Sequence, residues 1–356
     1  MSSRIEMTGR ERVLTAANRQ TPDRVPRIVP LERYVHEALS HHFGTNDLTR
    51  PLKLDMIWVG PGPSRARNDY ARYFTRPGVT WEDFGRGRIW DAEGQYAEYL
   101  YPLQNAESVD EILAFPWPDY TEAYRYAGLT ERVEQYHRQG FAVCGALAET
   151  IFEIAWQIRS MDRLFEDIHL KDEKATVLLD QITRQRVAAA QAYARAGVDL
   201  IELGDDVAMQ TGLLMSKRMH REWLKPRLQQ VIQAAWEINP RIKIWYHSDG
   251  KINDLIPDLM EAGVQILNPV QPECVDHAWV KATYGDQLAF SGGLGVQSVL
   301  PFGTPDAVRE HVRATIQTLG AGGGLIVGPS HVIERDVPLA NILAMLEAMD
   351  TYGKYE

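Results

Sequence analysis

Short apolar stretches alternate with longer amphipathic stretches along most of the chain. The apolar stretches end in glycine or polar residues, whereas the amphipathic stretches repeat apolar positions every three to four residues. The first pattern is typical of strands buried on both faces, and the second is typical of helices that cover them. Regular alternation of strands and helices favours a parallel sheet.

Eight strand–helix units can be counted along the sequence. The predicted strands cover 27–29, 54–59, 141–145, 198–203, 242–246, 264–267, 288–291 and 324–328. The predicted helices cover 8–18, 31–43, 129–139, 151–165, 172–197, 216–238, 252–262, 275–284, 304–319 and 338–352. Eight such units predict one (βα)8 TIM barrel over residues 1–356, with active-site residues at the C-terminal ends of the strands.

Residues 60–120 interrupt this rhythm, because prolines, glycines and aromatic residues dominate there. Within them, Arg86–Leu100 predicts a hairpin that turns near Asp91–Gly94. We interpret the region as an insertion after the second strand. It acts either as a lid over the site or as a solvent-exposed insertion that only supports the fold.

Polar side chains collect where the predicted strands end. Strand 242–246 leads directly into His247, Ser248, Asp249 and Gly250. Polar residues at or after other strand ends are Glu149, Asp205, Asp206, Gln210, Asn268 and His331; the second strand carries Asp55, and the seventh ends at Gly293. A barrel brings strand ends together regardless of their distance in sequence, so these side chains are candidates for one site.

Two histidines and a carboxylate at this rim suit a divalent metal of intermediate softness. We predict that His247, Asp249 and His331 bind it, with Asp205, Asp206 or Glu149 as a fourth ligand or a supporting partner. The alternative is a hydrogen-bonded His247–Asp249 pair without metal.

The remaining candidates also have structural alternatives. Asp205 and Asp206 either act on the substrate or hold the following helix through its backbone. Gln210 and Asn268 either contact substrate or bond neighbouring backbone. Gly293 either allows a ligand to approach closely or only permits a tight turn.

Composition and charge limit the classes of molecule that this protein is expected to bind. The chain has 356 residues, 45% of them hydrophobic, and a net charge of -10 without a long basic run. Nucleic acid and anionic membranes are therefore poor candidates. No apolar run approaches the length of a membrane span, the N-terminus lacks an apolar signal core, and the two cysteines predict no disulfide framework. A cytoplasmic protein is the expectation.

Several motifs together resemble the uroporphyrinogen decarboxylase superfamily over nearly the whole chain. They are Pro22–Pro26, Pro116–Asp119, Gly204–Asp206, His247–Gly250, Leu267–Gln271, Gly328–His331, Asp336–Pro338 and Asn341–Leu343. The resemblance implies a (βα)8 barrel, in agreement with the strand and helix pattern. A homodimer is implied by the resemblance alone.

The superfamily contains decarboxylases that need no cofactor. These resemble one another in an N-terminal Arg-Gln-Ala-Gly-Arg-Tyr stretch that grips substrate carboxylates. Here Arg27–Tyr34, ending in Tyr34, is a degenerate version of that stretch. Asp55 matches the position of an essential aspartate of these enzymes. An acidic chain that lacks these paired arginines is not expected to bind a polyanionic tetrapyrrole.

The superfamily also contains methyltransferases that work with corrinoid proteins. They hold zinc with a His-x-Cys pair and a later cysteine. The resemblance places Asp249 and His331 where those two cysteines stand, so a metal here would have harder ligands. Activation of an ether, alkoxide or water oxygen is compatible with such a centre.

The leading prediction is a metal-dependent methyltransferase or O-demethylase that acts with a corrinoid protein on a small molecule. Zinc is the expected metal, and Asp205 or Asp206 would orient the substrate or handle its proton. Expected substrate contacts are Glu149, Gln210, Asn268, Gly293 and Tyr34. The alternatives are a cofactor-free decarboxylase of a small carboxylate, with Asp55 and His331 as acid–base groups, and a ligand-binding barrel without catalysis.

Overall fold

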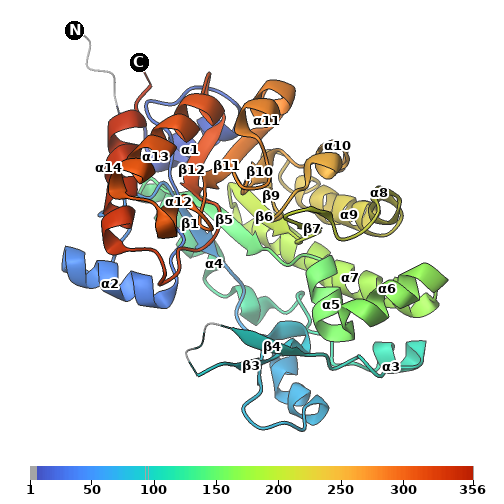
Figure 1. The fold of residues 1–356 in the computed structure, drawn as a ribbon. Helices are drawn as coiled ribbons and strands as arrows, with labels where there is room; N and C mark the ends of the chain where they lie inside the picture. Colours follow the sequence, from blue (N-terminus) through green and yellow to red (C-terminus); the bar gives the residue numbers. More distant parts are fainter. Residues whose placement is uncertain (1–5, 93, 95, 356) are drawn as a thin grey trace.

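The computed structural model describes residues 6–92, 94 and 96–355 as an α/β fold built on a curled parallel sheet (Figure 1). Seven strands form the sheet in the order β1–β5–β6–β9–β10–β11–β12, and every neighbouring pair is parallel. Their bounds are Met56–Val59, Ala142–Leu147, Leu200–Gly204, Lys243–His247, Ile266–Asn268, Ala289–Leu294 and Leu325–Pro329. The strands follow chain order, as the sequence pattern predicted.

Residues 26–28 connect the two edge strands of the sheet. Ile28 donates its backbone N–H to Val327 of β12 at 3.0 Å, and Asp55, just before β1, donates to the carbonyl of Arg27 at 3.3 Å. The predicted strand at 27–29 is therefore reduced to a single bridge. Flanking Pro26 and Pro30 lack the N–H groups that a longer ladder needs. The result is a TIM-barrel-like fold.

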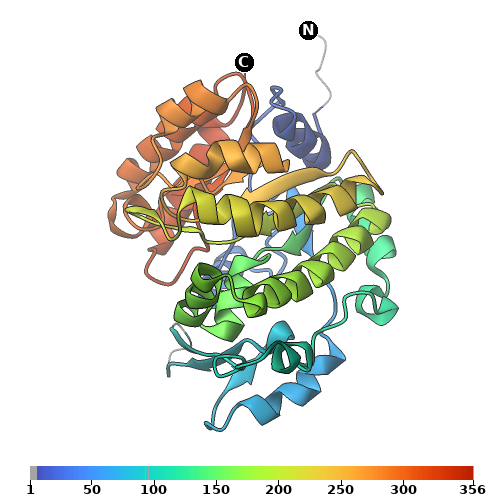
Figure 2. The same cartoon turned by 90° about the vertical axis from the view of Figure 1, so that its right-hand side faces the viewer.

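Helices cover the outside of the sheet, and α7 and α9 lie side by side there (Figure 2). The longer helices are α1 Gly9–Ala17, α2 Arg33–Phe43, α4 Leu129–Arg138, α5 Phe152–Arg159, α6 Met161–Leu170, α7 Glu173–Ala196, α9 Lys225–Trp236, α10 Ile256–Ala262, α11 His277–Tyr284, α13 Pro305–Leu319 and α14 Leu339–Tyr352. Within the described part of the chain, none combines the length and apolarity needed to cross a bilayer.

The predicted helix at 151–165 is divided in two. Ser160 has a φ of 70°, which is outside the helical region, and it separates α5 from α6. Another predicted helix, at 216–238, contains a short α-helix Lys217–Met219 (α8) and a π-helical turn at His220–Leu224 before α9. Apolar periodicity located these helices, but it did not reveal their interruptions.

Helix α1 closes the end of the sheet at which the strands begin. Its Val13, Ala16 and Ala17 are fully buried against the first residues of the strands, among them Met56 and Ala142. A Thr8–Glu11 capping box starts this helix, as the sequence predicted. The C-terminal ends of the strands therefore remain available for a site.

The segment between β1 and α4 forms a separate layer beside the barrel. It contains a three-stranded antiparallel sheet of β2 (Thr80–Trp81), β3 (Gly87–Trp90) and β4 (Ala97–Leu100), and a short helix α3 (Val109–Leu113). Strands β3 and β4 form the predicted hairpin, whose predicted turn includes position 93, outside the described residues. Figure 1 shows this layer next to α5. Its action as a lid stays a prediction.

Candidate functional site

His247 is the last residue of β9, and neighbouring strands hold its ring. Its backbone pairs with Gly204 of β6 on one side and with Asn268 of β10 on the other. The Nδ1 atom lies 2.6 Å from Oδ1 of Asn268, so Nδ1 carries the hydrogen of the neutral ring. The Nε2 atom then faces Asp206 Oδ1 at 3.8 Å and Asp249 Oδ1 at 3.9 Å.

The electrostatic setting of this cluster favours positive charge. Burial works to lower the pKa of His247, but the carboxylates of Asp249 and Asp206 and the bond to Asn268 outweigh it, and the pKa is raised. Burial raises the pKa of Asp249, with a further contribution from Asp206, while His247 opposes it. A proton or a cation between Nε2 and these carboxylates would therefore be stabilised.

His247, Asp206 and Asp249 also form a group that could hold a metal ion. Each offers one ligand atom, and these atoms all lie within 4.8 Å of one another. Ligand atoms that share one zinc ion are roughly 3.4 Å apart, because each lies about 2.1 Å from the ion. The distances of 3.8 and 3.9 Å from Nε2 are too long for hydrogen bonds and close to that spacing. The bond from Nδ1 to Asn268 is the kind of support that metal-binding histidines have.

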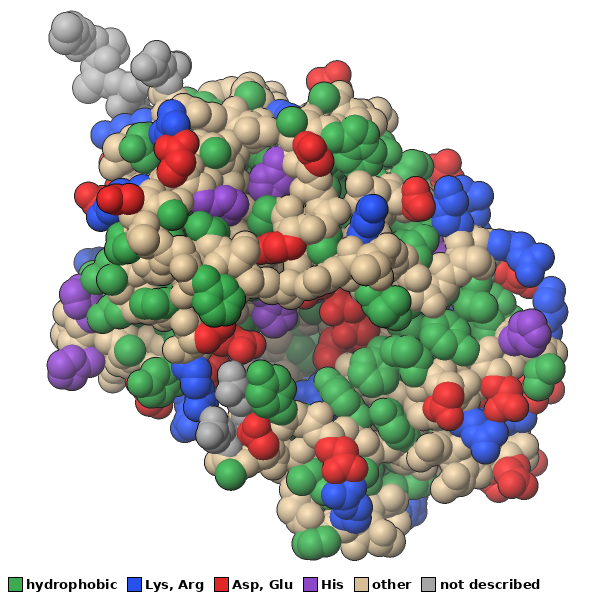
Figure 3. Space-filling model, in the orientation of Figure 1, with side chains coloured by type: hydrophobic (Ala, Val, Ile, Leu, Met, Phe, Trp, Pro, Cys, Tyr) green, Lys and Arg blue, Asp and Glu red, His purple; other side chains and the backbone are tan. Residues whose placement is uncertain are grey.

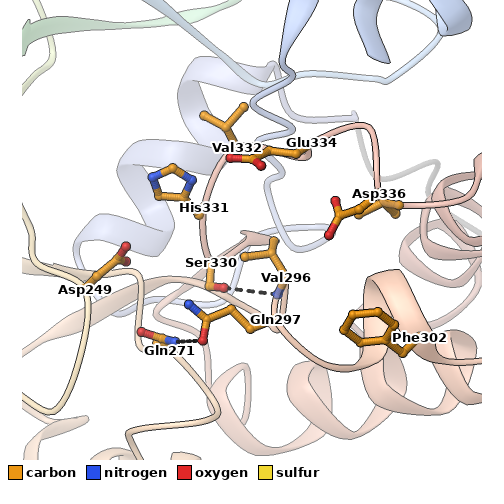
Figure 4. Close-up of a pocket in the computed structure, with 11 residues that line it drawn as sticks. Asp249, Gln271, Val296, Gln297, Phe302, Ser330, His331, Val332, Glu334 and Asp336 are labelled. Atoms are coloured by element: carbon orange, nitrogen blue, oxygen red, sulfur yellow. Dashed lines mark hydrogen bonds between the residues drawn. The ribbon is translucent and has the colours of Figure 1, made fainter. Parts of the chain in front are cut away.

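His331 does not complete this group, contrary to the predicted set. Its ring centre is 6.4 Å from that of His247, and its side chain is exposed. Strand β12 ends at Pro329, so His331 lies two residues beyond the strand end. Figure 4 shows it with Asp249 on one side of a cavity of about 460 Å³, opposite Asp336 and Phe302. The structure joins His247 and Asp249 as predicted, but Asp206 takes the third place.

A second cavity, of about 400 Å³, opens at the mouth of the barrel beside His247. Its lining is mostly apolar, and it reaches both His247 and His331. The face in Figure 3 is hollowed near its centre, where histidine, acidic and basic side chains meet. An apolar cavity with a few polar groups is typical of a site for a small organic molecule.

Glu202 and Trp58 are polar groups of this cavity that the sequence patterns missed. Trp58 donates its Nε1–H to Oε2 of Glu202 at 2.9 Å. Burial raises the pKa of Glu202, although His247 and Trp58 oppose the shift. The available signal was a single carboxylate inside the apolar strand Leu200–Gly204, where alternation turns Glu202 to the opposite face from Ile201 and Leu203.

Asp205 has a structural task. Its carboxylate accepts the backbone N–H groups of Ile151 and Glu153 at 3.0 and 2.9 Å, and it thereby caps the start of α5. Burial raises its pKa to about 7, against these hydrogen bonds. The helix that it holds is α5, and not the later helix that the sequence suggested. A direct action on substrate stays a prediction.

Asp55 does not join the site at the strand ends. It precedes β1 and therefore lies at the end of the sheet where the strands begin, whereas His331 follows the end of β12. Its buried carboxylate accepts bonds from Arg12 and Arg24 and from the backbone of Arg27. The structure does not bring Asp55 and His331 to one substrate.

The other predicted contacts divide into two groups. Asn268 and Glu149 lie at the rim, Asn268 against His247 and Glu149 after the end of β5. Gln210 is exposed and bonds Gln297, and Tyr34 is 57% exposed on α2.

A Cβ atom at Gly293 would approach Thr315 Cγ2 to 2.8 Å, and φ there is 87°. The chain's own packing therefore accounts for this glycine without a ligand.

Comparison with known proteins supports the family resemblance. A model of the uroporphyrinogen decarboxylase (URO-D) family matches residues 8–352. The methylcobamide:CoM methyltransferase MtaA of Methanosarcina barkeri is 28% identical over 197 residues, which cover 55% of this chain and 51% of that protein. A uroporphyrinogen decarboxylase of Legionella pneumophila (strain Lens) is 22% identical over 268 residues, 73% of this chain and 72% of that protein.

The fold agrees with these relatives. A methyltransferase from Methanosarcina mazei aligns with a TM-score of 0.68 and 18% identity, covering 98% of this chain and 99% of that one. The match to the M. barkeri methyltransferase spans only about half of that relative's length, so its activity is not transferred by similarity alone. The family match, in contrast, extends over almost the entire sequence. The chain therefore belongs to the uroporphyrinogen decarboxylase family.

Proposed function

We propose that this protein is a metal-dependent methyltransferase that demethylates a small methyl ether in concert with a corrinoid protein. One observation carries the proposal: Nε2 of His247 faces Asp206 and Asp249 at 3.8 and 3.9 Å, while Asn268 holds Nδ1. Relatives that include methyltransferases, one of them named for methylcobamide, add support.

The residues of the chain would divide the work as follows. His247, Asp206 and Asp249 would hold a divalent ion, with zinc as the expected metal, and Asn268 would keep the imidazole in the required tautomer. When bound, such an ion supplies Lewis acidity to an ether oxygen. The apolar cavity beside His247 would hold the organic part of the substrate and exclude water.

The reaction breaks the bond between the methyl carbon and the ether oxygen. The corrinoid partner would supply a nucleophilic acceptor whose electron pair forms the new bond to the methyl carbon, and the ether oxygen would keep the electron pair of the broken bond and gain a proton. Glu153 is a candidate proton donor. Its Oε2 accepts the backbone N–H of Asp206 at 3.1 Å, and burial together with Asp206, Asp205 and Glu149 raises its pKa well above the usual value.

Metal analysis of untagged protein tests the first half of the proposal. We expect one divalent ion per chain, lost in His247→Ala and retained in His42→Ala, because His42 is exposed on α2. The second half is tested by supplying cob(I)alamin with a panel of aromatic methyl ethers and following methylcobalamin by absorbance. Absence of bound metal in wild-type protein, or equal turnover in His247→Ala, would contradict the proposal.

A further inference from the structure

Strand β3 and the extended residue before it present two arginines and a tryptophan on one face. Arg86, Arg88 and Trp90 alternate with Gly87 and Ile89, so their side chains share a side of the hairpin. Both arginine side chains are largely covered, with exposures of 11% and 15%. Two covered guanidinium groups side by side need negative charge nearby.

Glu149 supplies part of that charge. Its carboxylate accepts from Nη1 of Arg86 and, at 3.3 Å, from Nη2 of Arg88, and Gln157 donates to it at 3.0 Å. Burial works against ionisation of Glu149, but the two arginines and Gln157 outweigh it and its pKa is lowered. Glu82, which also bonds Arg86, is 48% exposed. The two covered guanidinium groups therefore share two partly exposed carboxylates, because Glu82 also lies 3.9 Å from Arg88 and the side chain of Glu149 is 30% exposed.

The arginines retain unused donors. The Nε atoms of Arg86 and Arg88 are both buried, and neither has a hydrogen-bond acceptor among the described residues. A buried donor without a partner is destabilising, because the folded chain does not replace the hydrogen bond that the donor makes to water. An oxyanion that displaces Glu149 from the pair could also bond these two Nε donors.

This cluster adjoins the site around His247. Glu149 follows β5, and the next residue, Thr150, donates its backbone N–H to Gly204 at 2.7 Å. Gly204 in turn pairs with His247. Glu153, four residues after Glu149 in sequence, accepts the backbone N–H of Asp206. The arginines therefore contact a residue, Glu149, that belongs to the same strand-end region as the His247 group.

We propose that Arg86 and Arg88 bind the carboxylate of an aromatic acid that is the substrate of this protein, with Glu149 as its competitor in the unliganded state. The ring is inferred from the aromatic neighbours of Arg88: its guanidinium carbon is 5.3 Å from the ring centre of Tyr99 and 5.9 Å from that of Trp90. A planar acid fits between such groups, because arginine pairs carboxylates in a fork and aromatic faces stack on rings. The inference rests on the proposed function for the reaction only, since binding needs no corrinoid.

Calorimetric titration with meta-methoxybenzoate and its uncharged counterpart meta-methoxybenzamide tests the proposal. We expect the wild type to prefer the acid by about tenfold or more. Arg86→Gln and Arg88→Gln should each remove most of that preference, while affinity for the amide stays nearly unchanged. Arg76→Gln is the matched control, because Arg76 belongs to the same layer but pairs with Glu98 at the exposed surface. It should keep the wild-type preference.

Glu149→Gln gives a prediction of opposite sign. Removing the internal competitor should tighten binding of the acid and leave the amide unchanged, whereas a purely structural ion pair predicts no such selectivity. All titrations are repeated after dialysis against a chelator, so that arginine-dependent binding is separated from binding to a metal. Equal affinity for acid and amide in the wild type would overturn the proposal. So would acid binding that depends on metal and not on either arginine, even if the protein proves to be a methyltransferase.

Discussion

The bond between Asn268 and His247 offers a stringent test of the metal site. Asn268 is 5% exposed at the end of β10, and its Oδ1 atom lies 2.6 Å from Nδ1 of His247. In Asn268→Ala the imidazole loses the acceptor that fixes its tautomer and orientation. Removal of such a supporting partner lowers metal affinity by about 10–100-fold. This equals about 1.4–2.8 kcal/mol, in the range for one buried hydrogen bond to an ionisable group.

Competition with a chromogenic zinc chelator measures this change in affinity. Asn341→Ala is the control for loss of a buried asparagine, because Asn341 is 2% exposed and its amide bonds Leu300 and Gly303 far from His247 in the fold. Asn268→Asp should keep zinc at least as tightly as the wild type, since a carboxylate in the same place accepts the Nδ1 hydrogen and adds negative charge. Equal zinc affinity in Asn268→Ala and Asn341→Ala would refute the reasoning.

Three further predictions concern stability and are checked by urea unfolding. Asp205→Ala should lower the free energy of unfolding by about 1–2 kcal/mol through loss of the α5 cap, with metal content unchanged; metal loss without destabilisation would contradict the capping role. Gly293→Ala should lower the free energy of unfolding by about 1–3 kcal/mol, because φ at this position is 87° and the added Cβ atom would contact Thr315. An unchanged free energy of unfolding would contradict this prediction. Burial lowers the pKa of His220 to about 4, so the unfolded chain binds more protons between about pH 4 and 6.5 and stability falls as pH drops. Between pH 7 and pH 5 the free energy of unfolding should fall by about 2 kcal/mol less in His220→Gln than in the wild type. An equal fall in both proteins would exclude a contribution from His220.

Local sequence signals predicted most of the secondary structure. The capping box at Thr8 and the apolar periodicity located α1, and Asp172 and Gly197 bound α7 as a cap and a left-handed terminus. Ser160 shows the limit of such signals. Its positive φ interrupts a continuous helical pattern, and packing of the surrounding chain determines it. The bridge at Arg27 likewise depends on pairing with both sheet edges, which no local pattern encodes.

The candidate site was predictable for residues at a strand end or within two residues of it. His247 and Asp249 were found in this way, because the end of β9 fixes their position. His331 lies as far past β12 as Asp249 lies past β9, but its ring centre is 6.4 Å from that of His247. The direction in which each loop leaves its strand is not encoded in periodicity. No sequence pattern indicated Arg86 and Arg88 as site residues, because their contact with Glu149 joins positions 61 or more residues apart.

The total charge at the rim connects the metal-binding group with the arginine pair. Asp206 and Asp249 with a neutral His247 would neutralise a divalent ion, and oxygen ligands leave such an ion more Lewis acidic than thiolates do. This donor set suits an ether oxygen better than a thiol. An anionic substrate, however, would meet Asp206, Asp249 and Glu149 along the rim. Guanidinium groups that bind its carboxylate would remove this repulsion, so an acid that is also a methyl ether satisfies both halves of the site.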